Sequence, residues 1–473
     1  MLNNQRYFDR KTENNQQELF RALEMMKPGE AFLRRGKMIY LDNSSTTRQA
    51  DEVTDVMTGV MKNDFGNPSS LHDMGLRAEK RVEDARRVFA ATIGADAGEV
   101  FFNSCGTEGS NMIFHGAVNS GKHRGNKIIT TEVEHPAVLE TCRRLEHEGV
   151  EVVRIGVDPM CRINMDDFVE ALDDKVILVS VMTVNNETGT IMPVKEIAEI
   201  AHSYGQPGGK WDRYRSGILD RNKPAQSREG GDSFWEDKRS GKDDAFWRDG
   251  SVRGVRKNRG RILVHTDAVQ AYGKVDLRGT GADLMNFSGH KFHGPKGTGA
   301  VYIKKGIRIP SYITGGGQEK NLRSGTENVP GIAGLGEAAR LAYTAFEENV
   351  RSMAEVRNYL LNGIIESIDD IRINSPQDGC PSILNVSFRG TRGEVILHTL
   401  EEDGIFVSTG SACSSNKANK GSHVLRAMGL SKEEIEGALR FSFSRYNTRE
   451  EMDFVLDRLK TAVKRFRKLG KFR

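Results

Sequence analysis

The feature that most constrains this chain is a regular alternation of short apolar runs with amphipathic helical segments between residues 37 and 346. The longest run, Val176–Val184, is mostly apolar and rich in β-branched residues, which is typical of a strand buried on both faces. Helical spacing is found in Arg77–Ile93, which Gly94 ends, and in Val194–Tyr204. Strands that alternate with helices predict an α/β fold with a doubly wound, mostly parallel sheet. Such a sheet binds ligands at the carboxyl ends of its strands.

The order of these signals divides the 473 residues into three parts. Residues 1–36 are polar and rich in Asn and Gln, so we expect an N-terminal extension. Residues 37–346 carry the alternating pattern and form the predicted large domain. Residues 347–473 contain longer helical segments and fewer strands. Capping boxes at Ser431–Glu434 and Thr448–Glu451 precede two of these segments, which predicts a smaller α+β domain.

One segment of the large domain, residues 206–260, breaks the pattern. It contains 14 Lys or Arg, 9 Asp or Glu, nine Gly and all three tryptophans, Trp211, Trp235 and Trp247. A stretch this long without strand or helix signals is either functional or disordered. We interpret it as a flexible surface insertion. The alternative is a module that binds RNA or a partner protein, because Trp and Arg can stack on bases.

Composition excludes several classes of protein. The formal net charge is only +4, and no apolar run is long enough for a membrane helix, so we expect no membrane segment. The five cysteines are scattered and form no C-x-x-C pair, which argues against a disulfide framework and against a metal site. With no apolar secretory segment at the N-terminus, these features predict a cytoplasmic protein with reduced thiols.

Two charged side chains follow predicted strands that lie close together in the sequence. Lys291, in SGHKFHGPKG, is flanked by small and polar residues and is a candidate Schiff-base lysine; the alternative is a solvated lysine on a Gly-rich turn. Asp267, in HTDAVQ, comes directly after a strand, where a carboxylate needs a cationic partner such as a protonated pyridine nitrogen. It could instead cap a helix. With one strand between them, both side chains can reach one ring.

Other polar clusters also follow predicted strands. NSCGTEGSN, residues 103–111, precedes a helix predicted from Met112 and can cradle a phosphate with its backbone N–H groups, unless it is only a capping turn. His135 follows another strand, and Asn185 and Asn186 end the Val176–Val184 run, where they either bind a ligand or close a turn. In STGSACSS, Cys413 lies on a polar loop rich in small residues and is a candidate nucleophile.

Ten motifs occur in a fixed order along the chain: YLDNSSTT, GNPSSLH, SCGTEGSN, EHPAVLET, VNNETG, HTDAVQ, SGHKFHGPKG, RSGTENV, STGSACSS and LRFSFSRYNT. Together they resemble the cysteine desulfurases of the NifS/IscS group, which are pyridoxal phosphate (PLP) enzymes of fold type I. The resemblance covers about residues 37–460 except the 206–260 segment. Cys105 in the phosphate turn and His293 after the lysine depart from the common pattern.

The resemblance implies a role for each matching residue. Lys291 would bind PLP covalently, Asp267 would pair with its ring nitrogen, Gln270 would contact its phenolic oxygen, and His135 would stack on the ring and assist proton transfer. The remaining residues fall into three groups: Gly106, Thr107, Ser288 and His290, with Thr326 of the partner subunit of a homodimer, for the phosphate; Asn185 and Arg440 for the substrate carboxylate; and Cys413 for the sulfur.

The implied activity is removal of sulfur from L-cysteine to give L-alanine and a persulfide on Cys413. The sulfur would then pass to an acceptor protein, either an iron–sulfur scaffold or a carrier for tRNA thiolation. Two other activities fit the same scaffold: a selenocysteine lyase and a PLP-dependent aminotransferase. An aminotransferase would have no need for Cys413 on a loop.

Overall fold

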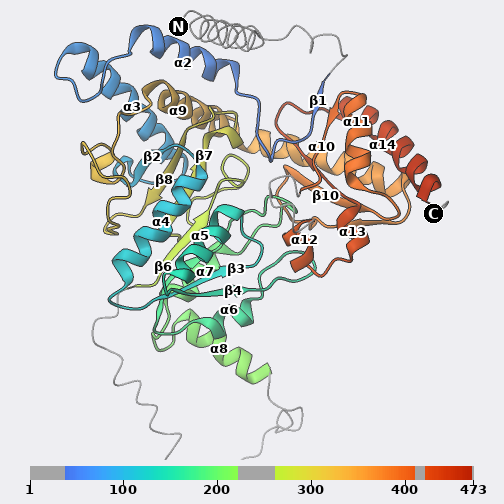
Figure 1. Cartoon of the computed structure of the whole chain (residues 1–473), viewed down its shortest axis with the longest axis horizontal. Coiled ribbons are helices and arrows are strands. Elements are labelled where there is room, and N and C mark those ends of the chain that lie inside the picture. Colours follow the sequence, from blue (N-terminus) through green and yellow to red (C-terminus); the bar gives the residue numbers. More distant parts are fainter. Residues whose placement is uncertain (1–37, 222–260, 411–420, 471–473) are drawn as a thin grey trace, which may run out of the picture.

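The computed structural model describes residues 38–221, 261–410 and 421–470. A seven-stranded sheet forms the centre of the larger part of the molecule (Figure 1). Its strands, in spatial order, are β2 (Val100–Asn103), β8 (Gly299–Ile303), β7 (Leu284–Ser288), β6 (Leu263–Asp267), β5 (Val176–Ser180), β3 (Lys127–Thr131) and β4 (Glu151–Ile155).

The sheet is mostly parallel, as the sequence predicts. All neighbouring strands from β7 to β4 are parallel, whereas β8 is antiparallel to both β7 and β2. Every residue of β5 is buried, but the strand ends at Ser180 and not at Val184. Beyond Ser180 the backbone still bonds to β6, through Thr183 N and Asp267 O at 3.0 Å, and then pairs irregularly at Val184 with Ile191.

Successive side chains along a strand point to opposite faces of the sheet, and here both sets are apolar, so helices cover both faces. The neighbours Leu178 and Val179 of β5 belong to different apolar clusters, and so do Leu263 and Val264 of β6. One cluster packs against helices α4 and α5, and the other against α3, α7 and α9. The helices of this part are α2 (Asp51–Asn63), α3 (Asp73–Thr92), α4 (Gly106–Gly121), α5 (Pro136–His147), α6 (Met165–Ala171), α7 (Val194–His202), α8 (Lys210–Arg221) and α9 (Val329–Thr344).

Helix α4 begins six residues earlier than the sequence pattern predicts, at Gly106 and not at Met112. Cys105 is its N-cap, with Sγ accepting from the N–H of Glu108 at 3.5 Å. The Glu108 carboxylate in turn accepts from the N–H of Ser104 at 3.0 Å. The bond to Cys105 satisfies the N–H of Glu108, one of the first N–H groups of the helix, so the turn of small residues is its beginning.

The C-terminal part has its own sheet, β12-β10-β9, and its own apolar core. The N-terminal strand β1 (Ile39–Tyr40) pairs with β11 of this part, so Ile39 and Leu41 are buried in the C-terminal core. The elements are α10 (Phe346–Ser367), β9 (Ile371–Ile373), β10 (Ile383–Phe388), α11 (Gly393–Glu402), β11 (Ile405–Phe406), α12 (His423–Ala427), α13 (Lys432–Glu436), β12 (Ala438–Ser442) and α14 (Arg449–Gly470). The capping box of Ser431 and Glu434 is present, as predicted.

The start of the 206–260 segment is folded, contrary to the expectation of a structureless insertion. Helix α8 buries Ile218, and Trp211 packs edge-to-face on Tyr204 with ring centroids 4.9 Å apart. Trp235 and Trp247 lie outside the described residues. Among the helices that the structure describes, none is both long and apolar enough to cross a membrane.

Candidate active site

A cavity of about 200 Å³ lies at the carboxyl ends of β6 and β7 and at the start of α4. Nine residues predicted from the sequence line it: Gly106, Thr107, His135, Asp267, Gln270, Ser288, His290, Lys291 and Arg440. They come from segments up to 334 positions apart, between Gly106 and Arg440, and the sheet topology brings them to one edge. This is the edge where a mostly parallel sheet binds ligands.

Asp267 is the last residue of β6, and its side chain is buried at the cavity. Its Oδ1 accepts a hydrogen bond from the N–H of Val269 at 2.9 Å. Burial raises the pKa of Asp267, although that hydrogen bond and the nearby Lys291 oppose the shift. A cation placed against this carboxylate would therefore stabilise its ionised form.

Lys291 ends the short 3₁₀ turn Gly289–Lys291, which directly follows β7. Its Nζ donates to the backbone carbonyls of Ser44 at 2.6 Å and Ser45 at 2.7 Å. The Ser44 carbonyl also accepts from Nε2 of Gln270 at 2.8 Å. The amine is thus held beside Gln270 by the backbone of Ser44 and Ser45, which belong to the YLDNSSTT motif.

The start of α4 provides a place for an anion. Gly106 packs closely against Val269, since a Cβ there would lie 2.7 Å from Cγ2 of Val269, so only glycine lets the first turn of α4 lie this close to the cavity wall. Oγ of Ser288 is buried and has no hydrogen-bond partner within the described residues, and Thr107 is exposed on the first helical turn. Free N–H groups, a helix dipole and an unsatisfied hydroxyl are the donors that a phosphate needs.

Both cavity histidines are held neutral. His135 caps α5, with Nδ1 accepting from the N–H of Ala137 at 3.1 Å, so the ring proton is on Nε2. Burial, with smaller contributions from Lys291 and His423, lowers the pKa of His135 to about 4. His290 lies 3.2 Å from Oγ1 of Thr46 through Nδ1, and burial likewise lowers its pKa to about 4.

Arg440, on β12, lines the cavity and is contributed by the C-terminal part of the chain. Its Nη1 donates to the carbonyl of Asn186 at 2.9 Å, and its Nη2 donates to Asp42 Oδ1 at 2.7 Å and Ser45 Oγ at 2.8 Å. The side chain is buried, and its Nε has no partner in the part of the chain that the structure describes. A carboxylate entering the cavity could accept from that remaining N–H.

Asn185 does not reach the cavity, which corrects the expectation from VNNETG. Its Nδ2 donates to the carbonyl of Val133 at 3.1 Å, and its Oδ1 accepts from the N–H groups of Glu187 at 2.9 Å and Thr188 at 3.0 Å. The side chain closes the turn, as the simpler alternative for this motif proposes. The neighbouring Asn186 lines the cavity instead.

Two predicted residues remain, Thr326 and Cys413. Thr326 is exposed and does not line the cavity of its own chain. Cys413 lies outside the described residues. The sequence analysis also missed Asp42, Ser44 and Ser45 as parts of the site; their signal was the polar cluster that directly follows the first strand. Across the described ranges, no group of His, Cys, Asp and Glu could hold a metal ion.

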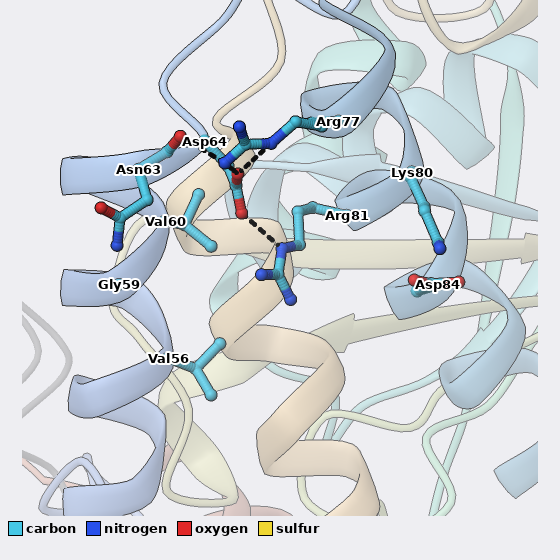
Figure 2. A pocket seen from close by; sticks show the side chains of 9 residues that line it. All are labelled: Val56, Gly59, Val60, Asn63, Asp64, Arg77, Lys80, Arg81 and Asp84. Atoms are coloured by element: carbon cyan, nitrogen blue, oxygen red, sulfur yellow. Dashed lines mark hydrogen bonds and ion pairs between the residues drawn. The ribbon is translucent and has the colours of Figure 1, made fainter. Parts of the chain in front are cut away.

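A second, larger hollow of about 540 Å³ lies between α2 and α3 (Figure 2). There Arg77 and Arg81 both bind the buried carboxylate of Asp64, Arg81 at 2.8 Å through Nε. These ion pairs lower the pKa of Asp64, with the hydrogen bond from Arg81 as the largest cause. None of the predicted site residues lines this hollow. The ion pairs join Asp64, directly after α2, to two arginines of α3.

Comparison with known proteins agrees with the geometry. The family model for class-V aminotransferases matches residues 39–206 and 252–455, and the gap falls within the 206–260 segment. A cysteine desulfurase IscS of Methanosarcina thermophila is 37% identical, over 93% of this chain and 96% of the relative. A NifS-like protein of known structure has a TM-score of 0.74 and 33% identity, covering 90% of this chain and 100% of that one. The structure of SspA in complex with cysteine has a TM-score of 0.65 and 27% identity, covering 87% and 100%.

The family implies PLP as the cofactor, and three features of the cavity fit it. They are the buried acid Asp267, the Ser288 hydroxyl, which has no partner in the described part of the chain, and the start of α4 at Gly106, where only glycine fits against Val269. The chain belongs to the class-V aminotransferase family and, within it, to the cysteine desulfurases of the IscS/NifS type.

Proposed function

We propose that this protein takes sulfur from L-cysteine, releases L-alanine and carries the sulfur as a persulfide on Cys413. One observation supports this most: Lys291, Asp267, Gln270, His135 and Arg440 line a single cavity in a chain 37% identical to cysteine desulfurases. The related SspA structure is a complex with cysteine, which supports an amino acid as the ligand of that cavity.

In this proposal, Lys291 would hold PLP covalently, Asp267 would pair with the ring nitrogen and Gln270 would donate to the phenolic oxygen. The phosphate is bound at the start of α4, by backbone N–H groups there and by Ser288. When bound, PLP withdraws electrons from the Cα of the substrate and so acidifies its C–H bond. The raised pKa of Asp267 supports its role, because a ring cation would return the carboxylate to its ionised form.

The substrate carboxylate is bound by Arg440, whose buried Nε has no partner within the described residues. The amine of Lys291 would take the proton from Cα as a general base. His135 is neutral, because burial lowers its pKa to about 4. A neutral His135 would lie over the ring and relay protons through Nε2 without adding a further positive charge beside Lys291.

The sulfur step is a nucleophilic attack by the Cys413 thiolate on the substrate sulfur. A new S–S bond forms as the Cβ–S bond breaks, and the carbon gains a proton to become the methyl group of alanine. Overall, one thiol and one cysteine give one persulfide and one alanine, so no external oxidant or reductant is needed. Attack requires the thiolate, which is why a residue other than the buried cysteines is expected to act.

Alanine and persulfide measured after addition of L-cysteine to the PLP-loaded protein test this proposal. The Cys413→Ala variant should keep the visible absorbance of bound PLP and lose both products. Cys142→Ala is the matched control, because Cys142 is buried in α5, where burial raises its thiol pKa to about 12. Full alanine release by the Cys413→Ala variant would contradict the assignment of the nucleophile.

We also propose that the protein acts as a homodimer in which Thr326 of the partner subunit reaches the phosphate. Thr326 is exposed. Exposed apolar side chains concentrate in and around the α2–α3 connection, at Met61, Phe65 and Leu71. Sedimentation should give the mass of two chains, and Thr326→Ala should weaken PLP binding about tenfold, the loss expected for one hydrogen bond to a charged group. A monomer that binds PLP fully would contradict this.

The acceptor of the sulfur is proposed to be a protein, either an iron–sulfur scaffold or a carrier for tRNA thiolation, in the cytoplasm. RNA binding by the 206–260 segment stays the less favoured alternative, since Trp211 is already packed on Tyr204. Retention of the intact protein on RNA across a salt series decides it. Electrostatic binding should be strong at about 50 mM salt, so no retention there would exclude the RNA-binding alternative.

A further inference from the structure

Lys274 is a buried lysine that the mechanism above does not use. It lies on the turn after β6, four residues beyond Gln270, and is only 7% exposed. Burial lowers the pKa of Lys274, and no carboxylate of the described residues acts against that shift. Lys127 makes the contrast clear, because it is equally buried at 7% but pairs with Asp173 at 3.0 Å.

The side-chain hydrogen bond of Lys274 within the described residues goes to Gln270, which lines the cavity. Its Nζ donates to Oε1 of Gln270 at 3.4 Å. The other end of the same amide, Nε2, donates to the carbonyl of Ser44 at 2.8 Å, and Ser44 O also accepts from Lys291 at 2.6 Å. Lys274 is therefore joined to Lys291 through one side chain and one carbonyl.

The chemistry of the Lys274 ammonium and the Gln270 amide determines which end of the amide faces Lys274. An ammonium group has three donors and no acceptor, whereas a glutamine amide has a donor end and an acceptor end. Beside Lys274, only the oxygen end of Gln270 can be placed favourably. The NH₂ end must then face Ser44 and the cavity that Gln270 lines.

We propose that Lys274 is a positioning residue that holds the Gln270 amide with its NH₂ end toward the cofactor's phenolic oxygen. This rests on the proposed roles of Gln270 and Lys291 at PLP. A donor at that oxygen favours its ionised form and so lowers the pH at which the visible band of bound PLP titrates. Without Lys274, the amide can turn over and present its oxygen, which would lose this effect.

The test is a pH titration of the visible absorbance of the PLP-loaded protein. Lys274→Met should raise the titration midpoint by about half a pH unit to one unit, the effect of about one hydrogen bond. Lys274→Arg, which keeps a donor-only cation, should keep the unmodified midpoint. Lys274→Gln serves in place of the Met variant if that protein does not fold, and should shift the midpoint in the same direction.

A double-mutant cycle shows whether Lys274 acts through Gln270. In a Gln270→Ala background, Lys274→Met should cause no further shift. An equal shift in both backgrounds would mean that Lys274 acts on Lys291 directly, which overturns the proposal, and so would an unchanged midpoint in Lys274→Met alone. Lys127→Met is the matched control and should lower thermal stability without moving the midpoint. If the unmodified protein shows no titrating band with PLP, the proposed function fails instead.

Discussion

Asp42 Oδ1 lies 2.7 Å from Nη2 of Arg440, and this ion pair joins residues 398 positions apart. Asp42 follows the first strand, β1, and Arg440 lies on the late strand β12. Together with Ser45 Oγ at 2.8 Å and the Asn186 carbonyl at 2.9 Å, the ion pair fixes both Nη atoms of the guanidinium. The buried Nε has no partner among the described residues, and we propose that it binds the carboxylate of the substrate.

Asp42→Ala should therefore raise the KM for L-cysteine more than it lowers kcat. We expect a rise of about tenfold, because the lost contact is one charge-assisted hydrogen bond. Steady-state alanine release over a range of cysteine concentrations measures both constants. Asp51→Ala is the control, since its ion pair with Arg48 is exposed. A KM that does not change would show that Arg440 needs no help from Asp42.

Asp267→Asn should abolish most of the activity while PLP still binds. An amide cannot keep the ring nitrogen protonated, so alanine release should fall at least about a hundredfold, the usual scale of an acid–base contribution. Without PLP, the same variant should be at least as stable as the unmodified protein, because burial raises the pKa of this carboxylate. A variant of near-normal activity would remove Asp267 from the site.

Gly106→Ala should weaken PLP binding about tenfold, because its Cβ would lie only 2.7 Å from Cγ2 of Val269 and would displace the first turn of α4, where we propose that the phosphate binds. Gly59→Ala is the matched control within helix α2, where a Cβ meets nothing within 4 Å, beside the hollow in Figure 2. It should stabilise the protein by about 0.5–1 kcal/mol and leave PLP binding unchanged. Titration with PLP and thermal unfolding separate the two effects. Equal PLP affinity in both variants would contradict the proposed phosphate site at the start of α4.

Glu134 gives the protein a pH-dependent stability. Burial, together with the charge of Asp267, raises its pKa to about 8. Between the ordinary glutamate pKa and 8, the folded state binds more protons than the unfolded state, so the stabilising contribution is lost as the pH rises. Glu134→Gln should remove this loss. The free energy of unfolding of the variant, relative to the unmodified protein, should increase by roughly 1–4 kcal/mol from pH 5 to pH 8, and parallel profiles would contradict it.

The anchors of the site could be predicted from the sequence because they depend on strand order. Asp267 and Lys291 follow two strands that prove to be parallel neighbours, β6 and β7, so their side chains meet at one edge. The antiparallel direction of β8 was not predictable in this way. The connection between β7 and β8 is short and rich in glycine, which permits a return along the same edge.

Finer features needed the three-dimensional contacts. The start of α4 at Gly106 could not be recognised from the sequence, because glycine and other small residues carry no apolar helical spacing. In the structure, Cys105 and Glu108 supply the caps there. Which residue of the pair Asn185–Asn186 faces the cavity depends on the turn that Asn185 closes with its own side chain. No local pattern indicates that the YLDNSSTT segment packs beside Lys291, because that contact joins residues 247 positions apart.

The most direct test of the account is the position of the covalent PLP linkage. Reduction of the loaded protein with borohydride fixes the cofactor on its lysine, and peptide mass spectrometry then locates it. The account predicts the label on Lys291 and its loss in the Lys291→Ala variant. A label on any other lysine, with Lys291 unmodified, would contradict the convergence of Lys291 and Asp267 on one ring.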